Sequence, residues 1–446
     1  MAVAGFAMIG IFMALVMGKK VVPMVAFIVV PLTFAVAMGA GPDVGGYVIE
    51  SLQDLAPVVA LLTFAILYFS TMIDAGLFNP LIRKVLSVTG EDPLRILLGT
   101  AVLALVVSLD GEGTSTILIV VGAFLPLYKR LGIRVVHLVC VLALAIMSTN
   151  LTPWGGPVAR VAVALKLDPQ ELFITMIPAM LVMAACTIAV AFVLGMRERR
   201  RLEWSASDRR HIVPAGGPGT PAAGDLHGEV DPARLLGNEQ TIRPRLIWFN
   251  AALTIALLVA LVTELAAAPV LFMAAFAIAI LVNYPRPSQQ KERLEKHAPT
   301  LLTVVTMILA AGVLTGVLTG TGMIDAMANS LINIIPSSLD GHFGPVMALL
   351  ALPGQFFLSS DAYYFGVVPI LSEVGVQHGL TPLESASAAL LAGPIHALSP
   401  LVPALLLIAG LTGLDIGEIV RKNLKWALAV SVVAAGAVFA FGIVPL

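Results

Sequence analysis

Long apolar stretches separated by short polar segments run along almost the whole chain. Stretches such as 246–262 and 424–444 contain enough residues to cross about 30 Å of hydrocarbon at about 1.5 Å per residue of helix. A helix satisfies its own backbone polar groups inside a bilayer, so the pattern predicts an all-α polytopic membrane protein. Ten full crossings are expected, in two sets of five: 2–17, 21–40, 55–79, 133–166 and 171–195, then 246–264, 268–284, 299–320, 384–412 and 424–444.

Two further apolar stretches, about 93–128 and 343–374, have a polar break near the middle. We expect re-entrant hairpins there, because non-helical backbone at membrane depth is tolerated only where protein or a wet cavity surrounds it. The predicted organisation is a first membrane repeat over 1–195, a polar cytoplasmic linker over 196–245 and a second repeat over 246–446. The first repeat contains a hairpin at 93–128, which is followed by a broken helix at 133–166. The second repeat contains a hairpin at 343–374 and a broken helix at 384–412.

Composition and charge support this reading and orient it. Of 446 residues, 59% are hydrophobic and 12% charged, whereas soluble domains carry about 25% charged residues. With an external N-terminus, the predicted cytoplasmic segments hold 24 of the 26 Lys and Arg residues, leaving Arg160 and Lys166. This segregation follows the positive-inside rule and places both termini outside a bacterial cytoplasmic membrane. The first apolar run is expected to be a retained helix rather than a signal peptide, and Cys140 and Cys186 are not expected to form a disulfide.

An internal repeat connects the two halves. Met72-Ile73-Asp74-Ala75 recurs 251 residues later as Met323-Ile324-Asp325-Ala326, and the same offset relates Gly90 to Gly341, Ser108 to Ser359 and Asp110 to Asp361. Because five crossings is an odd number, the second copy must enter the membrane upside down, so the first hairpin opens to the cytoplasm and the second outward. Inverted repeats place a substrate near the midplane, between broken helices. For the two aspartates of the repeated motif we expect capping or interhelical roles.

The two hairpin tips carry most of the candidate chemistry. The first, 108–116, reads SLDGEGTST, and its glycines allow the backbone to turn and to approach a ligand closely. Asp110, Glu112 and the neighbouring hydroxyls offer hard oxygen ligands at membrane depth. The second tip, 359–364, reads SSDAYY and adds Asp361. The alternatives are a solvated external loop for the first tip and interfacial positions for the two tyrosines.

Two proline-rich breaks interrupt the broken helices. The segment 147–157, MSTNLTPWGGP, cannot continue an α-helix, so its freed carbonyls can meet a substrate or ion. Its counterpart is 393–403, GPIHALSPLVP. Purely structural kinks are the alternative. Arg160 either snorkels outward or faces an anionic substrate, and His396 is either a proton carrier or a hydrogen-bonded helix histidine.

Several stretches resemble the citrate–divalent-metal:proton symporter family of the ion transporter superfamily. They are residues 5–35, FAILYFSTMIDAGLFNPLIRKV at 64–85, LDGEGTSTIL at 109–118 and PWGGPVARVA at 153–162. The resemblance implies proton-driven uptake of citrate complexed with a divalent cation such as Mg²⁺ or Ca²⁺, without a cofactor. It also implies a transport domain of hairpins and broken helices that moves like an elevator. The family's hairpin often has aspartate where this chain has Glu112, and the added methylene can alter metal preference.

The candidate site collects residues from both tips and both breaks. The expected substrate-binding residues are Ser108, Asp110, Gly111, Glu112, Gly113, Thr114, Ser115, Asn150, Thr152, Pro153, Gly155, Gly156, Arg160, Ser359, Ser360, Asp361, His396 and Ser399. Asp110, Glu112 and Asp361 are the candidates for contact with the metal or for proton coupling. A free citrate trianion would call for several Arg or Lys side chains, whereas a metal complex carries about one net negative charge, which suits a chain with one arginine at depth.

Three alternatives remain at this point. A sodium-coupled di- or tricarboxylate transporter of the same superfamily would work without divalent metal. An intramembrane aspartyl protease would use Asp110 and Asp361 as its dyad, but the order Asp-Gly-Glu-Gly and the inverted hairpins disfavour it. A channel seldom has paired broken helices. The expected partners are the lipid bilayer, protons and a second copy in a homodimer by analogy of fold; a nucleic-acid partner is not expected.

Overall fold

The computed structural model describes residues 1–18, 20–111, 113–202, 241–332 and 342–445, and in this part of the chain all regular elements are helical. Those of the first half are α1 (Ala2–Met17), α2 (Pro23–Ala37), α3 (Val44–Asp74), α4 (Asn79–Thr89), α5 (Pro93–Val107), η1 (Ser108–Asp110), α6 (Gly113–Arg130), α7 (Val135–Thr149), α8 (Gly156–Leu165) and α9 (Pro169–Arg201). Those of the second half are η3 (Pro244–Leu246), α11 (Ile247–Val262), α12 (Ala268–Asn283), α13 (Pro287–Gly320), α14 (Met323–Ile332), α15 (Phe343–Phe357), η5 (Ala362–Val367), α16 (Val368–Gln377), α17 (Pro382–Leu390), α18 (Gly393–His396), α19 (Pro403–Thr412) and α20 (Ile416–Ala440).

Six of the described helices are long and apolar enough to cross a membrane: 44–74, 93–110, 169–201, 244–262, 287–320 and 416–440. Others among the ten expected crossings are shorter, such as α1 with 16 residues and α2 with 15. At about 1.5 Å per residue these span about 24 Å, somewhat less than the hydrocarbon core. The helical, multi-pass fold expected from the sequence is present, and the broken stretches 133–166 and 384–412 are divided into α7 with α8 and α17 to α19.

Two helices begin earlier than the sequence predicts. Helix α3 starts at Val44 rather than near 55, and α13 starts at Pro287 rather than near 299. In each case a proline, Pro57 or Pro299, lies inside the helix. Packing against neighbouring helices compensates for the hydrogen bond that an internal proline removes, so these prolines do not mark helix starts.

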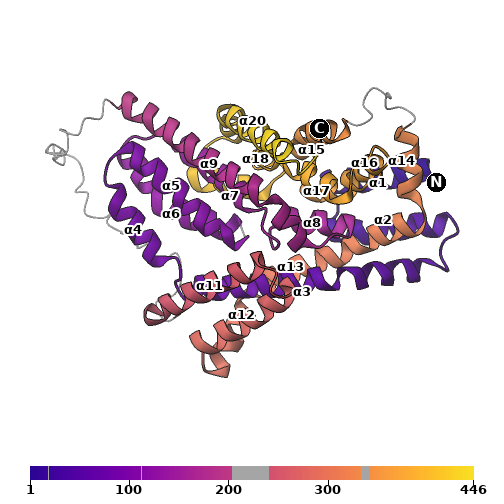
Figure 1. The fold of residues 1–446 in the computed structure, drawn as a ribbon, viewed down its shortest axis with the longest axis horizontal. Coiled ribbons are helices and arrows are strands. Elements are labelled where there is room, and N and C mark those ends of the chain that lie inside the picture. Colours follow the sequence, from indigo (N-terminus) through magenta and orange to yellow (C-terminus); the bar gives the residue numbers. More distant parts are fainter. Residues whose placement is uncertain (19, 112, 203–240, 333–341, 446) are drawn as a thin grey trace.

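Helices α3 and α13 pack along a seam of small residues. Gly312, Gly316 and Gly320 recur every fourth residue of α13, and a Cβ at Gly316 would lie 2.7 Å from the carbonyl oxygen of Tyr47 in α3. A Cβ at Gly320 would meet the Tyr47 ring at 2.2 Å. Spacing of this kind lets two membrane helices approach backbone to backbone. The two helices therefore form a close-packed pair that runs through the lower part of Figure 1.

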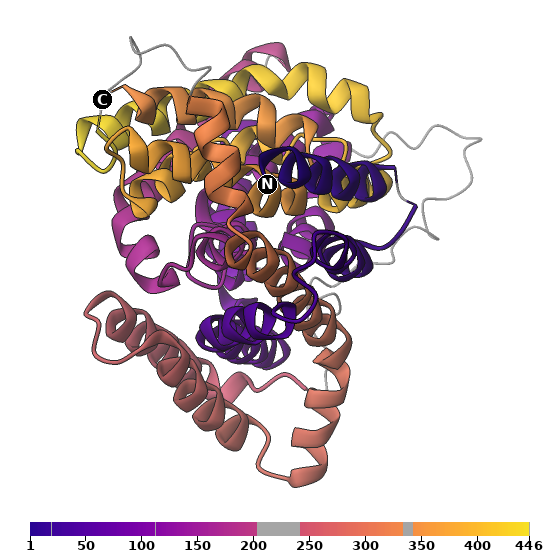
Figure 2. The same cartoon turned by 90° about the vertical axis from the view of Figure 1, so that its right-hand side faces the viewer.

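The helices divide into two groups, each with its own hydrophobic core. We call α1–α3 and α11–α13 the frame group, because their buried side chains make up most of one core, which also takes in Trp154 and side chains of α8, η5 and α16. We call α5–α9 and α15–α20 the hairpin group, because the other core lies among them. Figures 1 and 2 show α3, α11, α12 and α13 on one side of the molecule and the hairpin group on the other. The short helices α4 and α14 follow α3 and α13 and lead from the frame group to the hairpins.

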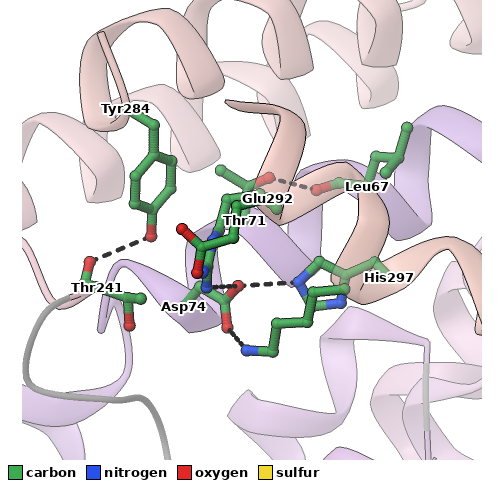
Figure 3. Close-up of polar contacts among 9 residues, drawn as sticks. Leu67, Thr71, Asp74, Thr241, Tyr284, Glu292 and His297 are labelled. Carbon is green, nitrogen blue, oxygen red and sulfur yellow. Dashed lines mark hydrogen bonds and ion pairs between the residues drawn. The ribbon is translucent and has the colours of Figure 1, made fainter. Parts of the chain in front are cut away.

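Asp74, the last residue of α3, is 2% exposed and lies within a group of cations on α13 (Figure 3). Its carboxylate accepts from Arg293 Nη1 at 3.3 Å and from His297 Nε2 at 2.9 Å, and it pairs with Lys296. A carboxylate at the C-terminal end of a helix opposes the helix dipole, so these cations offset both the burial and the dipole. The aspartate therefore fastens the end of α3 to α13.

The end of the linker is joined to the same corner. The N–H of Arg243 donates to the Ala75 carbonyl at 2.9 Å, and its Nε donates to the Asn283 carbonyl at 2.8 Å. Tyr284, which follows α12, donates from its hydroxyl to the Thr241 carbonyl at 3.1 Å (Figure 3). Of the predicted linker 196–245, residues 203–240 lie outside the described part of the chain.

The repeat partner of Asp74 has a different setting. Asp325 lies in the first turn of α14, where a helix favours negative charge, and it is exposed. Among the described residues it forms no ion pair. The 251-residue register of the sequence motif therefore does not place the two aspartates in equivalent positions.

We expect Asp74→Ala to lower the free energy of unfolding by about 3 kcal/mol, because it leaves the buried guanidinium of Arg293 without its carboxylate partner on α3. Asp325→Ala is the matched control and should stay within about 0.5 kcal/mol of the parent protein. Thermal unfolding of both purified proteins in the same detergent makes the comparison. Equal Tm values for the two variants would contradict a structural role for the Asp74 cluster.

Candidate functional site

The first hairpin turns where the sequence predicts. Helix α5 ends at Val107, a single 3₁₀ turn covers Ser108–Asp110, and α6 begins at Gly113. Gly111 between them has φ +77°, and a Cβ there would lie 2.5 Å from Cδ1 of Trp154. The left-handed backbone and the close approach of the indole both require glycine at this position.

Polar side chains satisfy the tip from within the protein. Asp110 is 4% exposed, and its Oδ2 accepts from the hydroxyl of Ser115 at 2.9 Å. Ser108 Oγ donates to the Ala104 carbonyl at 2.6 Å and lies 2.5 Å from Oγ1 of Thr149 in α7. A carboxylate buried in this way needs such donors or a cation. The tip is therefore joined to the broken helix beside it.

The first break contributes a second link to the tip. Trp154 Nε1 donates to the carbonyl of Leu109 at 2.9 Å, so the indole satisfies a tip carbonyl that no helix can use. The break is itself a tight turn in which Gly155 N donates to the Thr152 carbonyl at 2.8 Å. A Cβ at Gly155 would lie 2.1 Å from the Asn150 carbonyl oxygen, so only glycine fits there.

The second tip and the second break are joined through a histidine. His396 Nδ1 lies 2.7 Å from the Gln355 carbonyl, which can only accept, so Nδ1 carries a hydrogen. Its Nε2 lies 2.6 Å from Ser360 Oγ. Ser399 Oγ donates to the Phe356 carbonyl at 2.7 Å, and Ser359 Oγ accepts from the backbone N–H that follows Asp361 at 3.3 Å. The bonds to the Gln355 and Phe356 carbonyls satisfy the end of α15.

A π-helical segment, Ala362–Val367, follows the second tip. Such segments are rare and often lie at functional sites, because the wider turn re-aims side chains. Tyr363 and Tyr364 lie within it and are 0% and 1% exposed. The interfacial position considered for these tyrosines is therefore wrong, since both rings are buried within the hairpin group's core.

One ion pair bridges the two halves of the chain at this point. Arg160 in α8 donates from Nε to Oδ1 of Asp361 at 2.8 Å. Its Nη1 donates to the Gly156 carbonyl at 3.0 Å. The side chains are 30% and 13% exposed. Arg160 does not snorkel outward; it joins the first break to the second tip.

A cavity lies where the hairpin group meets the frame group. The hairpin group contributes Asp110, Gly111, Trp154, Gly156, Ala159, Arg160 and Phe365. The frame group contributes Leu62, Ile66, Phe69, Ser70 and Ile73 from α3 and Thr300, Thr303, Val304, Met307 and Ile308 from α13. Its charged lining residues are Asp110 and Arg160, with hydroxyls from α3 and α13 opposite them. The cavity can therefore accept a polar ligand of mixed charge.

The predicted site residues fall into three sets. Asp110, Gly111, Gly156 and Arg160 line the cavity. The residues that build the tips and breaks around it are Ser108, Gly113, Thr114, Ser115, Asn150, Thr152, Pro153, Gly155, Ser359, Ser360, Asp361, His396 and Ser399. Glu112 lies outside the described residues.

Sequence reasoning missed the frame side of the cavity. Ser70, Thr300 and Thr303 are hydroxyl residues within apolar helices, and that contrast was the available signal. In the described residues no group of three or more His, Cys, Asp or Glu side chains is placed to hold a metal ion. Asp110 and Asp361 belong to different tips of the described structure.

Comparison with known proteins identifies the family. The profile of the citrate transporter family matches residues 7–393. A Bacillus subtilis (strain 168) protein named "Citrate transporter" is 44% identical, with 100% of this chain and 99% of that protein covered. A protein of the same organism named "Mg(2+)/citrate complex secondary transporter" is 42% identical, with coverage of 98% and 97%.

A solved structure shares the fold at low sequence identity. The Alcanivorax borkumensis YdaH transporter superposes with a TM-score of 0.52 at 13% identity, covering 89% of each chain. The aspartyl protease alternative is overturned, because the family and the named relatives are transporters. The profile match and the two full-length relatives show that this chain belongs to the citrate transporter family, whose members are multi-pass membrane transporters and not enzymes.

Proposed function

We propose that this protein takes up citrate complexed with a divalent metal ion, such as Mg²⁺ or Ca²⁺, in symport with protons across the bacterial cytoplasmic membrane. The observation that carries the proposal is the cavity between the two helix groups. Its lining contains both a buried carboxylate, Asp110, and a guanidinium, Arg160. The relative named as a Mg²⁺/citrate complex secondary transporter supports the same substrate.

The charge of the cavity favours a complex over free citrate. Free citrate carries three negative charges, and Arg160 is the basic residue that lines the cavity in the described part of the chain. Asp110 would repel a free trianion. A citrate–metal complex presents carboxylates to Arg160 and a cation to Asp110, so both charges of the cavity are compensated. The divalent ion thus enters as part of the substrate rather than as a resident cofactor.

Proton coupling requires a carboxylate that exchanges its proton during transport. Asp110 and Asp361 are the described candidates, with Glu112 the third from the sequence. Asp110 is buried and hydrogen-bonded to Ser115, and Asp361 is paired with Arg160, so protonation of either changes the charge of the cavity by one unit. His396, bonded to Ser360 beside Asp361, is a further candidate.

An inverted repeat and an elevator-like movement fit the division into two groups. Helices α3 to α9 and α13 to α20 follow the same order: a long helix, a short one, a hairpin, a broken helix and a long helix. One core lies among the hairpins and broken helices and the other mainly among the frame helices, with the cavity where the two groups meet. Sliding of the hairpin group along α3 and α13 would carry the cavity across the membrane. External termini and a homodimer are part of this proposal.

In proteoliposomes, labelled citrate uptake should require both a divalent cation and an inward proton gradient. Because the complex compensates Asp110 and Arg160 together, uptake should fall to background when the metal is chelated. A panel of metals, each with and without a sodium gradient and a protonophore, provides the measurement. Full uptake in chelator with sodium would instead support a sodium-coupled carboxylate carrier.

Asp110→Asn should reduce uptake by about tenfold or more, because the neutral amide cannot offset the positive charge of the metal ion. Asp54→Asn is the matched control, because Asp54 pairs with Lys166 at a half-exposed position away from the cavity. Uptake is compared at equal amounts of reconstituted protein. Parent-level uptake by the Asp110 variant would remove this carboxylate from the site.

Cross-linking the two groups should arrest transport if the hairpin group moves. A Cβ at Gly366 would lie 3.3 Å from Cγ2 of Ile9 in the frame group, so the pair Ile9→Cys and Gly366→Cys should be bridged by a short thiol reagent. The control pair is Met147→Cys and Gly393→Cys, 3.7 Å apart between Cβ positions within the hairpin group.

Both pairs are made after Cys140 and Cys186 are replaced by alanine. Each variant is its own reference, with uptake measured before and after bridging and again after reduction. Only the pair that joins the two groups should lose uptake on bridging. Undiminished uptake with that bridge fully formed would exclude the elevator movement.

A further inference from the structure

We propose that Asp361 is an internal competitor for the substrate and so sets the preference for the metal complex. In this reading, a substrate carboxylate and the Asp361 carboxylate compete for the same edge of Arg160. The released Asp361 loses its positive partner, and the metal ion, which the proposed function places at Asp110, offsets that loss by adding positive charge to the site. This inference rests on the proposed function and assigns Asp361 the role of a specificity-determining residue.

The geometry places the competition at one edge of the guanidinium. Arg160 Nε donates to Asp361 Oδ1 at 2.8 Å, and Nη1 donates to the Gly156 carbonyl at 3.0 Å. A guanidinium has five N–H donors in one plane. A carboxylate binds it best through two parallel hydrogen bonds to two N–H groups on the same edge. A substrate carboxylate that binds in this way through Nε must displace Asp361.

Arg160 is accessible to such a ligand. Its side chain is 30% exposed and lines the cavity, whereas Asp361 is 13% exposed and does not appear in the lining. A ligand in the cavity therefore meets the Arg160 guanidinium, while Asp361 holds its Nε. Arg160 also belongs to a regular helix, α8, whose backbone is satisfied by its own hydrogen bonds. The cation is the fixed partner of the pair.

Asp361 is the more adaptable partner of the pair. It follows the extended residue Leu358, which ends α15, and it precedes the π-helical segment 362–367. Ser359 before it is not helical and the segment after it is π-helical, so a small rotation here disrupts few backbone hydrogen bonds. Ser360 and Ser359, which directly precede Asp361, are anchored to His396 and to the Ala362 backbone N–H. Movement of the Asp361 side chain need not move the whole tip.

The charge balance then distinguishes the two forms of citrate. A carboxylate left unpaired at membrane depth is costly. Free citrate would displace Asp361 from Arg160 and leave both Asp361 and the remaining citrate carboxylates without a cation. The metal complex brings a cation with the displacing carboxylate. The pair between Arg160 and Asp361 therefore penalises the free acid more than the complex.

The test is the ratio of two dissociation constants measured by calorimetry on the purified full-length protein. One titration uses citrate with excess Mg²⁺, and the other uses citrate in buffer stripped of divalent ions. Asp361→Asn should lower the preference for the complex by about tenfold or more, mainly because metal-free citrate binds more tightly to the unmasked Arg160. Asp54→Asn, which removes a carboxylate from a surface pair with Lys166, should keep the parent ratio.

Two further variants separate the loss of the carboxylate from other effects of the substitution. Asp361→Ser removes the carboxylate with a smaller side chain and should lower the ratio as well, whereas Asp361→Glu should keep it. Parent protein without any preference for the complex would refute the proposed function itself. A preference in the parent that persists in Asp361→Asn or Asp361→Ser overturns the competition. Failure of both variants to fold would show that the pair is structural, which also overturns it.

Discussion

Hydrocarbon offers no hydrogen bonds, and this constraint governs every place where the chain leaves helical geometry at membrane depth. The first tip needs a donor for the Leu109 carbonyl, and the indole of Trp154 supplies it. The second tip needs partners for Ser360 and the end of α15, and His396 supplies them. Each tip is thereby tied to a broken helix. The site is built from the groups that satisfy these breaks.

The same constraint explains why two cores form instead of one. The breaks lie mostly within the hairpin group's core, and Trp154 of the first break packs against Phe69 and Phe272 of the frame group. The frame group has a different task, since α3 and α13 contact each other through glycines that allow the backbones to approach. Asp74 and its cations fasten one end of that pair. The cavity lies at the boundary of these two groups.

Much of this organisation was predictable because it depends on local chemistry. Glycines cluster around 111, and two prolines and two glycines fall within 153–157, so the sequence indicates an interruption at both places, and the helices end there. Prediction failed where tertiary packing overrides a local preference. Pro57 and Pro299 lie inside long helices because neighbouring helices support the backbone there. The contribution of α3 and α13 to the cavity was missed because isolated hydroxyls in apolar helices carry little signal.

The sequence by itself determined that the chain is a helical membrane protein with interrupted segments, and that carboxylates and one arginine lie at those interruptions. Hydropathy, proline and glycine act over a few residues, so a linear reading captures them. Only the tertiary structure decided which of these groups meet. Arg160 and Asp361 are 201 residues apart in the chain and 2.8 Å apart in space. Asp74 is buried and ion-paired, whereas its repeat partner Asp325 is exposed. Pairings of this kind depend on how whole helices pack, which no local pattern specifies.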